Sequence, residues 1–145
     1  MHNPSANLAR KITIFDFSDI KFCLFEQSQA VCLNRPNVVG VLMRYKNMPY
    51  SATCFDAVTA FETIYFWQDL PKCFCEIYRV LKPGGTFLIC NEVSGDEAKD
   101  EKWTKIIEEM TIYKDTELKI YLGQAMFRNI QIRKKNNWLC VTAEK

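Results

Sequence analysis

The segment that most constrains the fold is residues 55–92, because it reads as strand, helix and strand with a chemical marker at each junction. Residues 55–61 form a short, nearly unbroken apolar run, which is typical of a strand buried on both faces of a parallel sheet. Residues 86–90 resume an apolar, β-prone run after a helical pattern. A strand that returns after a crossover helix lies parallel to the first, so the segment predicts a right-handed βαβ unit.

The helix inside this unit has a start, an apolar stripe and an end. Asp69 is expected to cap it through a side-chain oxygen, and Pro71 falls in the first turn, where its missing N–H costs little. Apolar residues recur at three- and four-residue intervals, at Leu70, Phe74, Ile77 and Leu81. Residues 83–85, Pro-Gly-Gly, are predicted to end the helix, because proline cannot continue it and glycine accepts positive φ.

The chain before this unit predicts a similar arrangement. Residues 11–17, KITIFDF, indicate a strand, and Ser18 could cap a following helix that ends near residues 34–36. Residues 38–43 indicate a second short strand. The order of strand, helix, strand, loop and then a second βαβ unit predicts an α/β fold with a mostly parallel sheet.

The chain after the unit predicts two helices and a hairpin. The first helix carries a stripe that is expected to pack in the core: Trp103, Ile106, Ile107 and Met110. The second follows Asp115 as a cap and carries a similar stripe: Leu118, Tyr121, Leu122 and Ala125. Residues 127–133 and 138–143 alternate as strands about a Lys-Asn-Asn turn, which predicts a β-hairpin because asparagine tolerates left-handed backbone.

Composition limits the classes of function. With 145 residues and 48% hydrophobic residues, the chain is expected to form a single domain, 1–145. A net charge of +2 is too small to argue for a nucleic-acid or membrane partner, and no run approaches the ~18 apolar residues that span a bilayer, so we expect a cytoplasmic protein. The seven cysteines favour buried, reduced thiols, and Cys73-x-Cys75 is too isolated to predict a metal site.

Two strings carry a family resemblance: FDAVTAFETIYFW at 55–67 and YRVLKPGGTFLICNE at 78–92. With them the chain resembles the class I S-adenosylmethionine (SAM) dependent methyltransferases. The resemblance implies a Rossmann-like, three-layer sheet that is mostly parallel and closed by an antiparallel C-terminal hairpin. It also implies SAM as cofactor and a small-molecule methyl acceptor. Gly84 and Gly85 are expected to shape the fold rather than to hold a phosphate.

The cofactor-binding residues expected from the resemblance are Asp16, Phe17, Arg44, Met48 and Phe61. An acid at the carboxyl end of a parallel strand can accept hydrogen bonds from two ribose hydroxyls, which is the role expected of Asp16. The alternative is that Asp16 helps to cap the following helix with Ser18. Arg44 stands where the family commonly has an acid near the adenine amino group, and arginine cannot accept a hydrogen bond.

The expected catalytic residues are Glu62 and Tyr65, which follow the strand at the edge where α/β sheets bind ligands. Glu62 could bind a substrate amine or act as a base, and a solvated loop carboxylate is an equally weighted alternative. Methyl transfer is an in-line displacement that asks mainly for near-attack geometry in a dry pocket, so a strong base is not required. The only histidine, His2, is excluded as a catalyst because it lies near the terminus.

Besides Arg44, two departures from the family pattern matter. No glycine precedes Gly40, so the first strand and the glycine-rich SAM loop have no counterpart, and we expect a methyltransferase domain truncated at its front, with that strand missing. The strand at residues 11–17 should then pair with the strand at 55–61, because a gap of roughly 10 Å would leave unpaired backbone groups. Otherwise two exposed edges remain, through which chains could oligomerise.

Met126 replaces a family glycine at a helix end that favours positive φ. This replacement is expected to lower stability by about 1 kcal/mol.

The sequence leaves two functions open. One is methyl transfer from SAM to a small-molecule acceptor, with SAM binding weakly or not at all. The other is a non-catalytic methyltransferase remnant that acts as an interaction module or has no selected function. A nucleic-acid patch near Trp138 is disfavoured because a charged hairpin tip is usually solvated; it would consist of Arg128, Arg133, Lys134 and Lys135.

Overall fold

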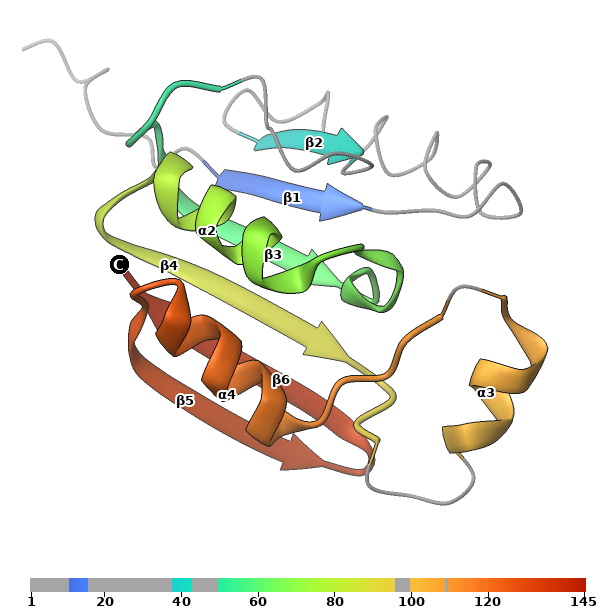
Figure 1. Cartoon of the computed structure of the whole chain (residues 1–145). Helices are drawn as coiled ribbons and strands as arrows, with labels where there is room; N and C mark the ends of the chain where they lie inside the picture. The colour runs from blue at the N-terminus through green and yellow to red at the C-terminus, as the bar shows by residue number, and fades with distance from the viewer. Residues whose placement is uncertain (1–10, 16–37, 43–49, 96–99, 109) are drawn as a thin grey trace, which may run out of the picture.

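The computed structural model describes residues 11–15, 38–42, 50–95, 100–108 and 110–145 (Figure 1). These residues form a six-stranded sheet in the order β2-β1-β3-β4-β6-β5. The first four strands in this order run parallel, and β6 and β5 are antiparallel to their neighbours. The strands are β1 (Lys11–Phe15), β2 (Val38–Leu42), β3 (Phe55–Phe61), β4 (Leu81–Asn91), β5 (Arg128–Lys135) and β6 (Trp138–Glu144). The predicted α/β, Rossmann-like sheet with a C-terminal antiparallel hairpin is confirmed.

Two helices lie on one face of this sheet, as Figure 1 shows for α2 and α4. The helices are the short 3-10 helix η2 (Ile64–Phe66), α2 (Leu70–Val80), α3 (Glu101–Ile106) and α4 (Asp115–Gln124). The helix predicted to follow Ser18 lies outside the described residues. The described part of the chain therefore shows one of the two helical layers expected of a three-layer fold.

The centre of the sheet is closed by a direct pairing of β1 with β3. The parallel register runs from Lys11 opposite Ala57 to Ile14 opposite Ala60. On its other side β1 pairs with β2, so both of its edges are hydrogen-bonded. No described strand stands between β1 and β3, and the predicted closure is confirmed.

The core lies between this sheet and the two helices. Phe74 of α2 is fully buried and meets Phe87 of β4 edge to face, with ring centroids 5.5 Å apart. Leu118 and Leu122 of α4 are also fully buried. Burial on both faces of β3 was a wrong prediction: Val58 and Ala60 are buried, but the alternate residues Ala57 and Thr59 are half-buried and Phe61 is exposed.

Both predicted signals at the ends of α2 were wrong in detail. The side chain of Asp69 makes no capping hydrogen bond; its backbone has a φ of 56°, and its carbonyl accepts the N–H groups of Lys72 and Cys73. The helix ends at Val80, before the Pro-Gly-Gly sequence. It ends there because Leu81 is already extended and pairs with Phe55 at the start of β4.

Gly84 and Gly85 instead form an irregularity inside β4. Gly84 has a φ of 78°, and the register between β3 and β4 shifts around it. A Cβ on Gly85 would lie 2.8 Å from the carbonyl oxygen of Lys82 and 3.1 Å from that of Asp56. Backbone atoms cannot yield as a flexible side chain can, so these glycines are needed for the local shape of the strand.

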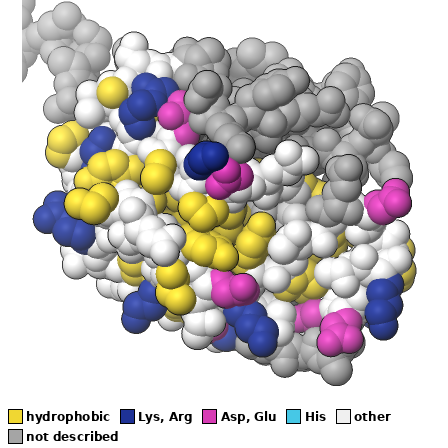
Figure 2. Space-filling view, in the orientation of Figure 1, with side chains coloured by type: hydrophobic (Ala, Val, Ile, Leu, Met, Phe, Trp, Pro, Cys, Tyr) yellow, Lys and Arg dark blue, Asp and Glu magenta, His cyan; other side chains and the backbone are white. Residues whose placement is uncertain are grey.

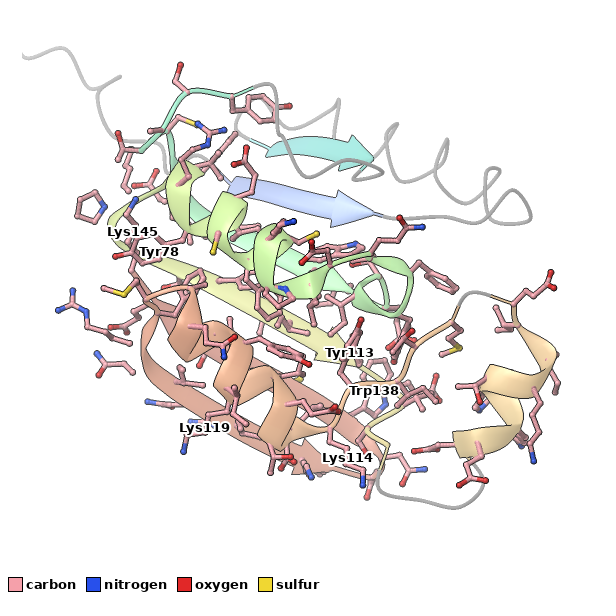
Figure 3. All side chains as sticks on the ribbon, in the orientation of Figure 1. Tyr78, Tyr113, Lys114, Lys119, Trp138 and Lys145 are labelled. Carbon is pink, nitrogen blue, oxygen red and sulfur yellow. The ribbon has the colours of Figure 1, made fainter. Side chains whose placement is uncertain are left out.

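The C-terminal residue fastens the end of the sheet to α2. Lys145 places its ammonium 4.6 Å from the ring centroid of Tyr78, and the two side chains lie together in Figure 3. The same ammonium donates to the carbonyl oxygen of Tyr78 at 2.7 Å. Its backbone exchanges hydrogen bonds with Gly84 and Gly85. This contact links the last residue to both β4 and α2.

The predicted packing of the first C-terminal helix in the core was wrong. Helix α3 has no buried residue; Trp103 is 39% exposed and Ile106 is 71% exposed. The helix ends after six residues because Ile107 is extended. Figure 1 shows α3 to one side of the sheet rather than on its face.

The predicted second helix and hairpin are confirmed. In α4 the stripe residues Leu118, Leu122 and Ala125 are buried, although Asp115 is the first helical residue rather than the cap. The hairpin turns at Asn136 and Asn137, whose φ values of 49° and 70° are those of a two-residue primed turn.

Met126 occupies the positive-φ position after α4 that the sequence predicted. Its φ is 73°, its side chain is 69% exposed, and the N–H of Phe127 donates to the carbonyl oxygen of Leu122. We expect Met126→Gly to raise the free energy of unfolding by about 1 kcal/mol, because glycine adopts this conformation without Cβ strain. Urea denaturation measures the change. The control, Gln124→Gly in the last turn of α4, should lower stability by a similar amount, and a loss in both variants would contradict the backbone argument.

Candidate functional site

The candidate site begins at Glu62, the first residue after β3. Its N–H donates to the carbonyl oxygen of Cys90 at 2.9 Å, which extends the β3–β4 pairing by one step. Its φ of 54° is left-handed. Its Oε1 atom accepts the N–H of Glu92 at the end of β4. The carboxylate therefore bridges the carboxyl ends of two parallel strands.

Tyr65, on the short helix η2, completes this arrangement. Its hydroxyl lies 3.2 Å from Glu62 Oε1 and accepts the N–H of Val93 at 3.1 Å. The carbonyl oxygen of Val93 lies farther from the hydroxyl, at 3.4 Å. Because a hydroxyl has one proton and a carboxylate is the stronger acceptor, Tyr65 donates to Glu62. The two predicted catalytic residues are thus in direct contact.

The surroundings of Tyr65 fix its protonation state. The side chain is 3% exposed, and burial raises the pKa of its hydroxyl, with the negative charge of Glu62 adding to the rise and the Val93 hydrogen bond opposing it. At physiological pH Tyr65 is therefore a neutral hydrogen-bond donor and cannot serve as a base. Of the pair, Glu62 is the group able to accept a proton or a hydrogen bond.

Buried polar atoms beside this pair lack a partner. Within the described part of the chain, no hydrogen bond reaches Thr63 Oγ1, Trp67 Nε1 or Asn91 Oδ1. Thr63, two residues after β3, is 2% exposed, and Asn91, the last residue of β4, is 1% exposed. A buried polar atom without a partner is uncommon and is a candidate contact for a bound molecule or water. Sequence reasoning missed these residues, although Asn91 is the polar residue that ends an apolar strand.

The remaining predicted site residues are placed as follows. Phe61, the last residue of β3, is 44% exposed and adjoins Glu62 at the same sheet edge. Asp16, Phe17, Arg44 and Met48 lie outside the described residues. Trp67, between η2 and α2, is 3% exposed and belongs to the core.

The described residues contain neither a cluster of metal ligands nor a membrane-spanning helix. Over the described ranges, no three His, Cys, Asp or Glu side chains come together to hold a metal ion. In the same ranges, no helix has the length and apolar character to cross a membrane.

The basic residues of the hairpin do not form one patch. Lys134 pairs with Asp115 of α4, with 2.8 Å between Nζ and Oδ2. Arg133 and Lys135 line an open groove of about 500 Å³ together with Trp138. On the face in Figure 2, Lys and Arg side chains are dispersed among other residues rather than gathered.

Comparison with known proteins identifies the family. The family model "Methyltransferase domain" matches residues 6–89. Cycloartenol-C-24-methyltransferase 1 of rice is 47% identical over 45 residues, which are 31% of this chain and 13% of that protein. Sterol 24-C-methyltransferase of Debaryomyces hansenii is 40% identical over 57 residues, 39% of this chain and 15% of that one. The chain thus matches well under a third of the length of these curated relatives.

Solved structures show the same fold. A SAM-dependent methyltransferase of Thermotoga maritima superposes with a TM-score of 0.70 at 16% identity, over 97% of this chain and 84% of that one. At this identity the likeness concerns the fold alone. With the family model covering more than half of the sequence, the chain belongs to the methyltransferase-domain family of class I SAM-dependent methyltransferases.

Proposed function

We propose that residues 1–145 form a single methyltransferase domain that transfers a methyl group from SAM to a small-molecule acceptor at the carboxyl edge of β3 and β4. The observation that carries the proposal is the contact of Glu62 with both Tyr65 and the N–H of Glu92. This contact lies where parallel α/β sheets bind ligands. Phe61 at the same edge is proposed to contact the cofactor, together with Asp16, Phe17, Arg44 and Met48.

The geometry suits a reaction that depends on positioning. Methyl transfer from a sulfonium needs the acceptor atom in line with the methyl group and little else. Glu62 would accept a hydrogen bond from the acceptor's N–H or O–H and would take the proton where one is lost. Tyr65 and the N–H of Glu92 hold that carboxylate in place by donating to it.

The acceptor is proposed from the relatives. Two curated proteins that share 45 and 57 aligned residues with this chain carry names for sterol methylation. A sterol is therefore the first acceptor to test, followed by small amines and phenols, which Glu62 could bind by hydrogen bonding. The cysteines that the structure describes are in no disulfide, and this supports the cytoplasm as the proposed location.

A non-catalytic role is the second candidate, and one observation favours it. Strand β1 pairs directly with β3, so the described sheet leaves no place between them for another strand. In the family a glycine-rich loop follows such a strand and approaches the cofactor. These 145 residues hold no glycine before Gly40 that could form such a loop, so we propose that they bind SAM weakly. The outer strands β2 and β5 would then offer backbone edges for a protein partner or a second copy.

Calorimetric titration of the 145-residue chain with SAM tests the proposal. We expect a dissociation constant on the order of 1 mM, because the cofactor loses the loop contacts that tighten it. At millimolar SAM, transfer of a labelled methyl group to the acceptor panel should fall about tenfold in Glu62→Gln, since the amide is a weaker acceptor and no base.

The control is Glu101→Gln on exposed α3, which should leave transfer unchanged. A micromolar constant would contradict weak binding. Equal transfer by wild type and Glu62→Gln would remove the acceptor site from this edge. No transfer by the wild type at saturating SAM would favour the non-catalytic role.

A further inference from the structure

Two cysteines face each other across the antiparallel strands β4 and β6. Cys90 and Cys140 are direct partners in the register of this pair. Residues directly opposite each other in an antiparallel pair have Cα atoms about 4.5–5.5 Å apart. A disulfide spans Cα separations of about 4.4–6.8 Å, so this register gives the Cα separation that a disulfide needs.

Both thiols lie on the sheet face away from α2 and α4. Their neighbours along each strand are buried toward those helices, at Ile89 and Asn91 on β4 and at Leu139 and Val141 on β6. Cys90 and Cys140 themselves are half-buried and are not disulfide-bonded. Residues directly opposite each other in an antiparallel pair project to the same face of the sheet, so the two cysteine side chains are neighbours.

The groove on this face gives access to one of the two. Cys140 lines the open space of about 500 Å³ with five other residues: Gln131, Arg133, Lys135, Trp138 and Thr142. Two of these residues are cationic and none is acidic. A negatively charged reagent would be concentrated at such a surface, and the effect would weaken with added salt.

We propose that Cys90 and Cys140 form a reversible disulfide, and that an anionic disulfide such as oxidised glutathione, guided by the groove, is the oxidant. The Cys140 thiolate attacks one sulfur of oxidised glutathione, forming a mixed disulfide and releasing one glutathione thiolate. The Cys90 thiolate then attacks the Cys140 sulfur and releases the second. Two electrons pass from the protein to glutathione, and the two protons lost by the cysteines end on the released thiols or in water.

The order of attack follows from the surroundings of each thiol. Cys140 lines the groove and meets the reagent first. Cys90 does not line the groove, and burial raises the pKa of its thiol, which disfavours Cys90 as the first nucleophile. Once the mixed disulfide has formed, Cys90 lies directly opposite Cys140 on the neighbouring strand, so its attack is intramolecular.

The proposed disulfide would lie beside the candidate site and does not require that site to be catalytic. The carbonyl oxygen of Cys90 accepts the N–H of Glu62, so the cross-link would fasten β6 to the strand end that positions this carboxylate. The strand register and the groove do not involve the cofactor, so we expect the disulfide to form whether or not SAM is bound.

The test incubates the folded chain with oxidised glutathione, alkylates the remaining thiols, digests the protein and identifies linked peptides by mass spectrometry. We expect the peptides that contain Cys90 and Cys140 to be joined, with the loss of two hydrogens. In Cys90→Ser, Cys140 should keep a glutathione adduct; in Cys140→Ser, Cys90 should remain reduced. Exposed Cys75 should gain glutathione in every variant, as an internal control.

A charge-reversed variant distinguishes electrostatic attraction of the reagent by the groove from mere accessibility of Cys140. Combining Arg133→Glu with Lys135→Glu should slow cross-linking by oxidised glutathione about tenfold and leave oxidation by neutral hydrogen peroxide unchanged. Reduced Cys90 and Cys140 in a sample whose Cys75 is fully modified would overturn the proposal. So would adducts on Cys140 that never resolve into the Cys90 disulfide. Equal slowing with peroxide would reject the electrostatic role of the groove.

Discussion

Replacing Phe74 by alanine is expected to lower the free energy of unfolding by about 4 kcal/mol, a large part of the 5–15 kcal/mol typical of a domain. Phe74 is fully buried on α2 and packs edge to face on Phe87 of β4. Phe87 in turn lies 5.8 Å from Phe127, between ring centroids, at the start of the hairpin. Truncation removes apolar contact area and leaves a cavity at the junction of α2, β4 and the segment after α4.

Urea denaturation followed by far-ultraviolet circular dichroism measures this loss. Phe61→Ala is the matched control, because the same side chain is 44% exposed at the end of β3 and its removal should change stability by about 0.5 kcal/mol or less. If Phe74→Ala does not fold, Phe74→Leu should still lose about 1.5 kcal/mol. Equal losses at positions 61 and 74 would contradict the placement of the core between α2 and β4.

The sequence predicted this core well where its period was regular. The stripe predicted for α2 is buried, as are Leu118, Leu122 and Ala125 of the second stripe. Strand β3 has the predicted bounds because hydrophobic spacing and tertiary packing agree there. In α3 the same spacing was misleading. Trp103 and Ile106 remain exposed, since period alone cannot tell whether a helix lies against a sheet or beyond its edge.

Local signals were weaker than long-range pairing at the ends of α2. Proline and glycine at residues 83–85 predicted the helix end, but Leu81 leaves the helix earlier because it pairs with Phe55. Asp69 has the side chain of a cap, but its left-handed backbone places a carbonyl there instead. The pairing of Leu81 with Phe55, 26 residues earlier in the chain, therefore sets the end of α2 that residues 83–85 were expected to set.

The candidate site shows the same division. Glu62 and Tyr65 could be named as candidates from the sequence because polar and aromatic side chains follow an apolar strand, and their catalytic role stays a prediction. The bond from the N–H of Glu92 to Glu62 was not, because it joins residues 30 positions apart and depends on the β3–β4 register. The partnerless atoms of Thr63 and Asn91 were also beyond sequence reasoning, since burial of a polar atom depends on the assembled core.

Tyr65→Phe is expected to lower the free energy of unfolding by about 2 kcal/mol at pH 7. The change deletes only the hydroxyl, which leaves the N–H of Val93 without its acceptor and removes a donor from Glu62. Tyr121→Phe is the control: that side chain is half-buried, no hydrogen bond to its hydroxyl occurs within the described residues, and the loss should be about 0.5 kcal/mol or less.

The pH dependence of the free energy of unfolding gives a second test of the Tyr65 prediction. The pKa of Tyr65 is raised above its ordinary value of 10.0 chiefly by burial, so the folded state holds the phenol proton after the unfolded chain has lost it. The resulting stability is complete below pH 10 and falls as pH rises above 10, by at most about 1.4 kcal/mol per pH unit. Wild type should therefore lose stability faster than Tyr65→Phe between pH 10 and 11, while both titrate the same lysines. If the stability of both proteins fell in parallel, the Tyr65 hydroxyl would be solvated. It would then not hold the Glu62 carboxylate that the proposed acceptor site requires.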